Sequence, residues 1–358
     1  MKKNFMCALL SIATMVATSC GGNNAQTSEC ESKRESIELS GAGATFPLPF
    51  YNAVFEEFHA VNNDVVAYGG IGSGGGIRNL KDGIVDFAGS DAFLSDKEMS
   101  EMKPVVHIPT CMGAVVLAYN LPGVNELNLS GDVVADIFAG KITMWDDARI
   151  KDLNPQAQLP SQSIIPVYRS DGSGTTFIFT DYLSKVSKEW SEKYGVGKSV
   201  NFPAGQAAKG NPGVAGVIAQ TTNSIGYVGS EYAFAQKIPY ATLKNQCGEL
   251  VKPTAQSISA AANGEMPSDT RTMITNSSAK GAYPISCFTW IVVYKEQNYS
   301  NRTKDQALAT LDLIEFILSE KTQGITTKVH YAPLPAKAIE LSRENLKTIT
   351  FNGEALKK

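Results

Sequence analysis

Short apolar runs alternate with helix-like segments along most of this 358-residue chain, and that alternation restricts the possible folds more than any other feature. Runs such as 164–168 and 225–228 have the length and composition of buried strands, whereas apolar residues within 51–61 recur at helical spacing. Chains of this kind build α/β folds in which helices cover the sheets. We therefore expect an α/β architecture, and we see no repeat of solenoid period.

The same patterns place the remaining elements. Ser95 and Glu98 have the spacing of a capping box, and Ser130 stands where it could cap the next helix, 130–139. Residues 69–76 form a glycine loop that leads into a short helix. Further strands are expected at 37–40, 64–68, 84–88, 105–108, 114–119 and 288–294. Further helices are expected from about 47 to 61 and at 173–185, 214–220, 307–318 and 338–346.

The beginning of the chain has the layout of an export signal followed by a tether. Two lysines precede an apolar stretch at 5–16 and small residues at 17–19, which predicts a signal peptide over 1–19. The run Ala-Thr-Ser-Cys resembles a bacterial lipobox, so Cys20 is the expected lipidation site; an ordinary signal peptide with an incidental cysteine is the alternative. The polar segment 20–35 would be a lipid-anchored flexible tether. We expect an exported lipoprotein, periplasmic or at the cell surface, anchored to a bacterial membrane.

Composition argues against several other classes of protein. A net charge of −3 gives no basic field for nucleic acid. The three histidines are far apart in sequence, which argues against a histidine metal site. No CxxC pair occurs, which argues against a zinc ribbon or thioredoxin-like chemistry. We expect no metal and no cofactor.

Export would let cysteines oxidise, and Cys30, Cys111, Cys247 and Cys287 allow three pairings between which the sequence does not choose. Free buried thiols are an equally good interpretation for Cys111 and Cys287, which lie in apolar runs.

Three turns between an expected strand and an expected helix carry small and hydroxyl residues. They are 41–47 (GAGATFP), 70–76 (GIGSGGG) and 169–176 (RSDGSGTT). The start of a helix has free N–H groups and a partial positive charge, and glycine lets the backbone come close to a ligand. Hydroxyls add donors, and Arg169 adds a planar fork suited to an oxyanion. One such loop is usually a capped turn, but three together indicate an oxyanion site.

Enzyme-like interpretations of these loops fail on their spacing. Gly70, Gly72 and Gly75 match a dinucleotide fingerprint, but less than two helical turns separate this loop from the next expected strand, too little for a Rossmann crossover helix. No GxxxxGK[ST] motif exists, and neither Ser73 nor Ser173 lies in a GxSxG elbow. A serine hydrolase would also need a histidine base, and the three histidines lie outside these loops, which leaves open only an enzyme of unusual arrangement.

Beyond these physical arguments, the chain from Ser40 to about Phe351 resembles the periplasmic-type phosphate-binding proteins of the phosphate ABC transporter, the PstS family. The resemblance rests on these runs, in order: GAGATFP (41–47), GIGSGGGI (70–77), VDFAGSDAFLSD (85–96), GKITMWDD (140–147), LNPQAQLP (153–160), RSDGSGTTFIFTDYL (169–183), SIGYVGSEYA (224–233) and YAPLP (331–335). It implies a type II periplasmic-binding-protein fold: two lobes, each a mixed β-sheet flanked by helices, with a hinge crossed more than once. Lobe I would comprise 36–117 plus 286–358, and lobe II 118–285.

The resemblance also assigns roles to single residues. Eight of them would bind phosphate: Thr45, Phe46 through its backbone N–H, Ser73, Asp91, Arg169, Ser173, Gly174 and Thr175. Asp91 would accept a hydrogen bond from the phosphate's own proton, and Asp171 would orient Arg169. No residue is expected to be catalytic.

The function implied is high-affinity capture of inorganic phosphate in the cleft between the lobes and its delivery to an inner-membrane ABC permease, with its ATPase, for import. Such a protein is not an enzyme and acts as a monomer. Two alternatives stay open: a binder or sensor of another tetrahedral oxyanion, and a phosphate-ester hydrolase.

Overall fold

Eight strands join in one mixed sheet, in the order β2-β1-β3-β11-β4-β8-β6-β7. The computed structural model describes residues 35–356, so the expected signal peptide, Cys20 and nearly all of the tether lie outside the described residues. The strands of the large sheet are β1 (Glu38–Gly43), β2 (Val65–Gly70), β3 (Phe87–Ser90), β4 (Val105–Asn120), β6 (Ile165–Arg169), β7 (Gln206–Ala208), β8 (Ser224–Gly229) and β11 (Ser286–Tyr294). Two small sheets are formed by β5 (Asn128–Leu129), β9 (Thr242–Lys244) and β10 (Leu250–Val251), and by β12 (Thr350–Phe351) and β13 (Glu354–Ala355).

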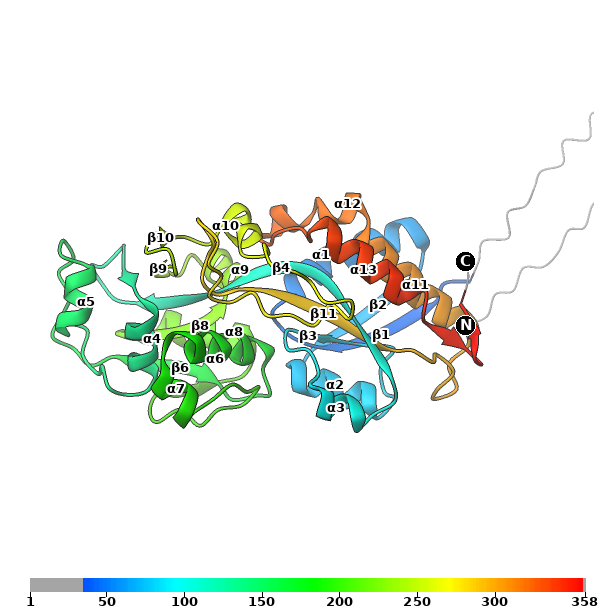
Figure 1. Cartoon of the computed structure of the whole chain (residues 1–358), viewed down its shortest axis with the longest axis horizontal. Helices are drawn as coiled ribbons and strands as arrows, with labels where there is room; N and C mark the ends of the chain where they lie inside the picture. Colours follow the sequence, from blue (N-terminus) through cyan, green and yellow to red (C-terminus); the bar gives the residue numbers. More distant parts are fainter. Residues whose placement is uncertain (1–34, 357–358) are drawn as a thin grey trace, which may run out of the picture. The chain divides into compact units, whose positions relative to one another are not determined.

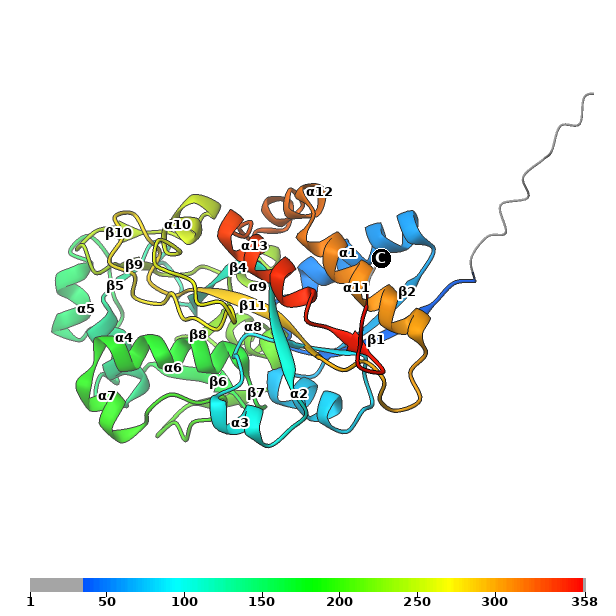
Figure 2. The same ribbon diagram turned by 45° about the vertical axis from the view of Figure 1, so that its right-hand side comes forward.

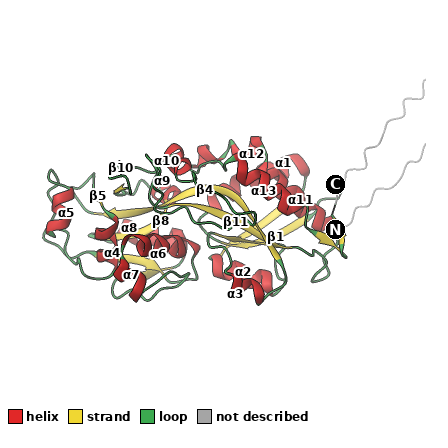
Figure 3. Cartoon of the chain, viewed as in Figure 1, coloured by secondary structure: helices red, strands yellow, loops and turns green. Residues whose placement is uncertain are grey.

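Helices flank the large sheet on both faces, as Figure 3 shows, which confirms the expected α/β class. The helices are α1 (Leu48–Asn62), α2 (Ser73–Lys81), α3 (Asp96–Ser100), α4 (Gly131–Phe138), α5 (Ala148–Leu153), α6 (Gly174–Val186), α7 (Lys188–Lys193), α8 (Gly210–Gln220), α9 (Ser230–Ala235), α10 (Ala255–Ala260), α11 (Lys304–Leu318), α12 (Glu320–Gln323) and α13 (Ala336–Leu346), with a 3₁₀ turn, η1 (Thr326–Val329). In Figure 1, α1, α11 and α13 lie on one side of the β1–β3 end of the sheet, and α2 and α3 lie on the other.

Strand β4 belongs to both halves of the sheet. Its first part pairs antiparallel with β11 as far as Ala114, and from Val115 to Asn120 it pairs antiparallel with β8. We call the β2-β1-β3-β11 part with its helices the first half, and the β8-β6-β7 part with its helices the second half. Figures 1 and 2 show β4 and β11 running side by side between the two groups of helices. The main chain therefore passes between the halves along extended strands.

The expectation of two separate strands at 105–108 and 114–119 is wrong, because β4 is one strand of 16 residues. Pro109 directly follows the first of the two expected strands. In the structure, Trp290 pairs with Pro109 while Thr289 pairs with Cys111, so the ladder shifts register at the intervening Thr110. A bulge of this kind is a place where a sheet tolerates proline, since one residue there is already unpaired.

Of the two serines expected to cap helices, Ser95 does so and Ser130 does not. The capping box is confirmed: the backbone N–H of Glu98 donates to Ser95 Oγ at 3.2 Å, and that of Ser95 donates to Glu98 Oε2 at 2.8 Å. Ser130 precedes α4 but its side chain makes no capping hydrogen bond.

The expected strand at 84–88 begins only at Phe87, and Ile84 is 63% exposed.

The glycine loop is shorter than expected, because α2 already begins at Ser73 and contains three glycines in its first turns. These glycines allow close packing: a Cβ at Gly76 would collide with the backbone of Ala42 and Gly43. Gly74 N donates to the carbonyl of Gly172 at 2.9 Å, which joins α2 to the loop before α6.

Three cysteines fall within the part of the chain that the structure describes, and all three are free thiols. Cys111 and Cys287 are buried in β4 and β11, as one of the two interpretations held, whereas Cys247 is exposed. Among residues 35–356 there is no helix with the length and apolar character that a membrane span requires.

Candidate anion-binding site

The three loops singled out in the sequence meet at one place. Gly174 N, at the start of α6, donates to Ser73 Oγ, at the start of α2, at 3.1 Å. The loop after β1 joins them through Asn211, whose side-chain amide bonds both Thr45 and Thr175. The predicted side chains here are buried: Thr45, Phe46, Ser73, Asp91, Arg169, Ser173 and Thr175 are each at most 6% exposed.

Strand order explains why loops so far apart in sequence come together. β1 is parallel to both β2 and β3, so the segments that follow these three strands leave the same edge of the sheet. Those segments carry Thr45, Ser73 and Asp91, respectively. Arg169 ends β6 in the second half, and α6 begins five residues later with Gly174. Ligands of open α/β sheets characteristically lie at such carboxyl ends.

Three tyrosines fix the backbone of the first loop. Tyr68 donates its hydroxyl proton to the carbonyl of Ala44 at 3.0 Å, Tyr232 donates to that of Thr45, and Tyr331 donates to that of Phe46.

Carbonyl and N–H point in opposite directions across a trans peptide bond. With the three carbonyls directed at tyrosines, the N–H groups of Thr45 and Phe46 point the opposite way. This orientation suits the predicted donor role of the Phe46 N–H.

Arg169 and Asp171 form a bidentate ion pair in which the arginine side chain is buried and the carboxylate is partly buried. Nε and Nη2 of Arg169 lie 2.8 and 2.6 Å from the two carboxylate oxygens of Asp171. Burial alone would raise the pKa of Asp171, but hydrogen bonds from Arg169 and its positive charge hold that pKa below its usual value. The pair fixes the guanidinium plane and leaves Nη1 for Thr175 Oγ1, at 3.3 Å.

Gly72 allows this pair to come against the first half. It has a φ of +87°, and a Cβ at this position would collide with the Asp171 carboxylate. Any other residue would therefore be strained and would push the ion pair away.

Asp91 supplies a buried carboxylate among donors. Its Oδ1 accepts the hydroxyl proton of Thr289 at 2.8 Å, and its backbone N–H donates to Ser73 Oγ at 3.2 Å. Burial raises the pKa of Asp91 to about 7, although the Thr289 hydrogen bond and the charge of Arg169 act in the opposite direction. A Cβ at Gly174 would collide with Asp91, so the carboxyl group lies directly against the start of α6.

Ser173 has a local role as the cap of α6. Its Oγ accepts from the backbone N–H of Thr176 at 3.0 Å. Helix α6 is 13 residues long, and its first turn carries a partial positive charge toward the place where the loops meet. The arrangement as a whole offers hydroxyl, amide and guanidinium donors together with one titratable acceptor, Asp91. A small anion that carries a proton of its own matches this set.

Sequence reasoning missed several residues that support the site. These are Asn211, Thr289, Tyr68, Tyr232 and Tyr331. The run Lys-Gly-Asn-Pro-Gly before the expected helix 214–220 contains the turn residues that could have drawn attention to Asn211. Thr289 and the tyrosines carry no local signal, because their partners lie far away in sequence.

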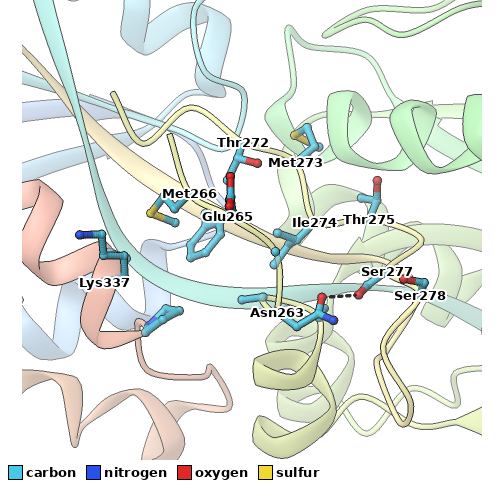
Figure 4. Close-up of a pocket in the computed structure, with 16 residues that line it drawn as sticks. Asn263, Glu265, Met266, Thr272, Met273, Ile274, Thr275, Ser277, Ser278 and Lys337 are labelled. Atoms are coloured by element: carbon cyan, nitrogen blue, oxygen red, sulfur yellow. Dashed lines mark hydrogen bonds between the residues drawn. The ribbon is translucent and has the colours of Figure 1, made fainter. Parts of the chain in front are cut away.

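A separate hollow of about 540 Å³ lies between the segment 261–278 and the start of α13, shown in Figure 4. Met266, Ile274 and Phe288 line it together with Glu265 and Lys337. None of the eight predicted phosphate ligands, nor Asp171, lines this hollow. The hollow is therefore distinct from the place where the three loops meet.

Comparisons with known proteins agree with this architecture. Residues 23–321 match the model of the PBP superfamily domain. The phosphate-binding protein PstS of Xylella fastidiosa strain Temecula1 is 40% identical over 324 residues, covering 88% of this chain and 87% of the relative. The protein of the same name from Methanocaldococcus jannaschii is 37% identical over 353 residues, covering 92% and 90%.

Two solved structures have the same fold. A putative phosphate ABC transporter substrate-binding protein with bound phosphate from Clostridium perfringens has a TM-score of 0.61 at 21% identity, over 83% of this chain and 100% of that chain. A phosphate binding protein from Stenotrophomonas maltophilia has a TM-score of 0.64 at 20% identity, over 86% and 94%. These likenesses confirm the two-lobed periplasmic-binding-protein fold.

Proposed function

Because the chain belongs to the PstS family of phosphate-binding proteins, within the PBP superfamily, we propose that it binds inorganic phosphate where the three loops meet. The observation that carries this proposal is the convergence of Ser73, Arg169 and the start of α6 on one buried point, with Asp91 beside them. The family is one of substrate-binding transport proteins and not of enzymes, and no residue here is proposed to be catalytic.

Each of the eight ligands has a place in this proposal. Arg169 supplies the positive charge, held by Asp171. The hydroxyls of Thr45, Ser73, Ser173 and Thr175 donate to phosphate oxygens, as does the backbone N–H of Phe46. The N–H of Gly174, which donates to Ser73 Oγ at 3.1 Å, is shared between that hydroxyl and a phosphate oxygen. Asp91 accepts a hydrogen bond from the phosphate's own proton.

Asp91 also gives a reason to prefer phosphate to sulfate. Phosphate keeps at least one proton near neutral pH, whereas sulfate is fully ionised. A buried carboxylate is an acceptor for the first and a like charge for the second, and like charges repel strongly where water is excluded. Asp91 would thus discriminate between the two anions mainly by repelling sulfate.

The two lobes would close on the anion. We propose that lobe I comprises 36–117 plus 286–358 and lobe II 118–285, with β4 and β11 as crossings of the hinge. Contacts that support such closure include the hydrogen bond from Gly74 N to the Gly172 carbonyl. Hinged closure of two domains around a ligand is a common binding mechanism.

In the cell, the protein would deliver phosphate to the permease subunits and ATPase of a phosphate ABC transporter. We propose that it acts as a monomer, exported and held to a bacterial membrane by lipid on Cys20. Replacing Cys20 by Ala should release the protein from the membrane fraction. Unchanged fractionation of that variant would contradict the anchor and leave the binding function untouched.

Titration of the purified mature protein with three compounds tests the function. Inorganic phosphate should bind tightly, sulfate should bind far more weakly, and p-nitrophenyl phosphate should not be hydrolysed. Equal or tighter binding of sulfate would favour a carrier of another tetrahedral oxyanion. Release of nitrophenol at a rate above that of the Arg169→Ala variant would favour a hydrolase.

A further inference from the structure

Asn211, near the start of α8, connects the two halves of the site without being one of its predicted ligands. Asn211 is fully buried. Nδ2 donates to Thr45 Oγ1 at 3.0 Å and to Thr175 Oγ1 at 3.1 Å. Oδ1 accepts from the backbone N–H of Gly229 at 3.0 Å. A backbone N–H can only donate, so this contact identifies the oxygen of the amide and directs both amide protons toward the two threonines.

The hydroxyl oxygens of both threonines are thereby saturated. A hydroxyl has two lone pairs and one proton. Thr45 Oγ1 accepts from the backbone N–H of Asn211 at 3.1 Å as well as from its Nδ2. Thr175 Oγ1 accepts from Asn211 Nδ2 and from Arg169 Nη1. With both lone pairs filled, each hydroxyl keeps only its proton to offer.

We propose that Asn211 is a positioning residue that makes Thr45 and Thr175 obligate donors toward the anion. This inference rests on the proposed function, since it explains how hydroxyls that could accept as well as donate are committed to an oxyanion. The hydroxyl of Ser73 is also left with only its proton to donate, because its Oγ accepts from the backbone N–H groups of Asp91 and Gly174. In this site, surrounding N–H groups fix these hydroxyls as hydrogen-bond donors before the anion binds.

Removing the amide should release both hydroxyls. In an Asn211→Ala variant, each threonine could rotate its proton away from the ligand, and the backbone N–H of Gly229 would lose its acceptor. Hydrogen bonds to a charged group are among the stronger ones in proteins, so we expect phosphate affinity to fall about 10- to 100-fold.

A matched control separates this effect from general destabilisation. Asn154 is also buried and also makes three such contacts, with Nδ2 donating to the carbonyls of Asn128 and Ile150 and Oδ1 accepting from the N–H of Asn128. It lies at the end of α5, away from the three loops. Asn154→Ala should lower the melting temperature but leave phosphate affinity within about twofold of wild type.

The decisive measurement is a double-mutant cycle read by calorimetric titration with phosphate. Asn211→Ala is compared with its parent in wild type and in a Thr45→Val/Thr175→Val background, where no hydroxyl remains to be oriented. We expect the effect of Asn211→Ala to shrink to about twofold or less in that background. An undiminished effect would show that Asn211 merely supports the fold, and no effect in wild type would also overturn the proposal. If wild type binds sulfate and not phosphate, the proposed function fails, and the same cycle run with sulfate still decides the role of Asn211.

Discussion

Lys198 Nζ lies 2.5 Å from Glu98 Oε1 and so joins the segment after α7 to the short helix α3. The carbonyl of Lys198 also accepts the N–H of Ser173, the cap of α6, at 2.8 Å. Burial alone would raise the pKa of Glu98, but the hydrogen bond from Lys198 and those from Ser95 keep it below its usual value. This ion pair links the two halves of the molecule beside the proposed anion site.

The first prediction concerns this link. Lys198→Met keeps the aliphatic stem and removes the charge, so closure should lose one favourable contact. Partly exposed ion pairs contribute about 1 kcal/mol or less, so phosphate affinity should fall by about fivefold at most, and the loss should vanish at high salt. Calorimetric titration at low and high ionic strength measures both. Lys337→Met is the control, since Lys337 pairs with its neighbour Glu340 within helix α13. Equal effects of the two variants would contradict the prediction.

The second prediction concerns Arg169. Truncating a buried charged partner costs about 2–5 kcal/mol, so Arg169→Ala should weaken phosphate binding by tens to thousands of fold. Arg169→Lys should recover only part of this loss, because lysine cannot pair with both oxygens of Asp171 and also reach Thr175. Titration of both variants, with thermal melting to confirm folding, measures the difference. Normal phosphate binding by Arg169→Ala would place the site elsewhere.

The third prediction concerns the choice between anions. Asp91→Asn replaces a repelling carboxylate by an amide that can donate, so the ratio of sulfate affinity to phosphate affinity should rise at least tenfold. The expected tenfold change follows because a mispaired buried polar group costs about 1–3 kcal/mol of binding free energy. Competitive calorimetry with both anions measures the ratio. A folded variant with an unchanged ratio would show that selectivity arises from another group.

The fourth prediction follows from the pKa of the same carboxyl group. Because burial raises the pKa of Asp91 to about 7, the group gains charge as the pH rises through 7. Sulfate does not titrate in this range, so its weak binding to wild type should decrease further between pH 5.5 and pH 8.5. Asp91→Asn should remove most of that dependence. Sulfate titrations at both pH values compare the two proteins, and parallel profiles would exclude Asp91 as the titrating group.

The fifth prediction concerns Glu231, a buried acid in α9. Neither of its carboxylate oxygens meets a hydrogen-bond partner of ordinary geometry within residues 35–356. Burial raises the pKa of Glu231 well above its usual value, and the nearby Asp91 adds to the rise. The folded state therefore holds this proton more tightly than the unfolded state. The stabilising contribution is complete below the unfolded pKa and is lost as the pH rises through the folded pKa.

Glu231→Gln should therefore flatten the fall in stability with rising pH. Thermal unfolding at pH 5 and pH 9 should show a smaller drop in melting temperature for this variant than for wild type. Glu340→Gln provides the control, because Glu340 lies on the surface of α13. A variant that loses as much stability as wild type between the two pH values would refute the assignment.

The sequence was sufficient to predict what depends on local chemistry. The loops around Thr45, Ser73 and Gly174 could be recognised because glycine, hydroxyl and helix-start signals lie within a few residues of one another. Asn211 could not, since its partner Thr45 is 166 residues away and only the fold brings them together. The unbroken course of β4 could not be predicted from the sequence, because the bulge that accommodates Pro109 depends on pairing with β11, which no local pattern reveals.

The shared strand β4 also determines when the folding chain can acquire its function. Its central ladder pairs Gly113 with Cys287, and Cys287 Sγ donates to the Gly113 carbonyl across 174 residues of chain. Pairing between such distant segments is slow, because a long loop must close before the contact contributes stability. The middle of the sheet cannot form until β11 has paired with β3 and β4, and until then no shared strands join the half that carries Thr45 to the half that carries Thr175. Anion binding is therefore among the last properties that the folding polypeptide acquires.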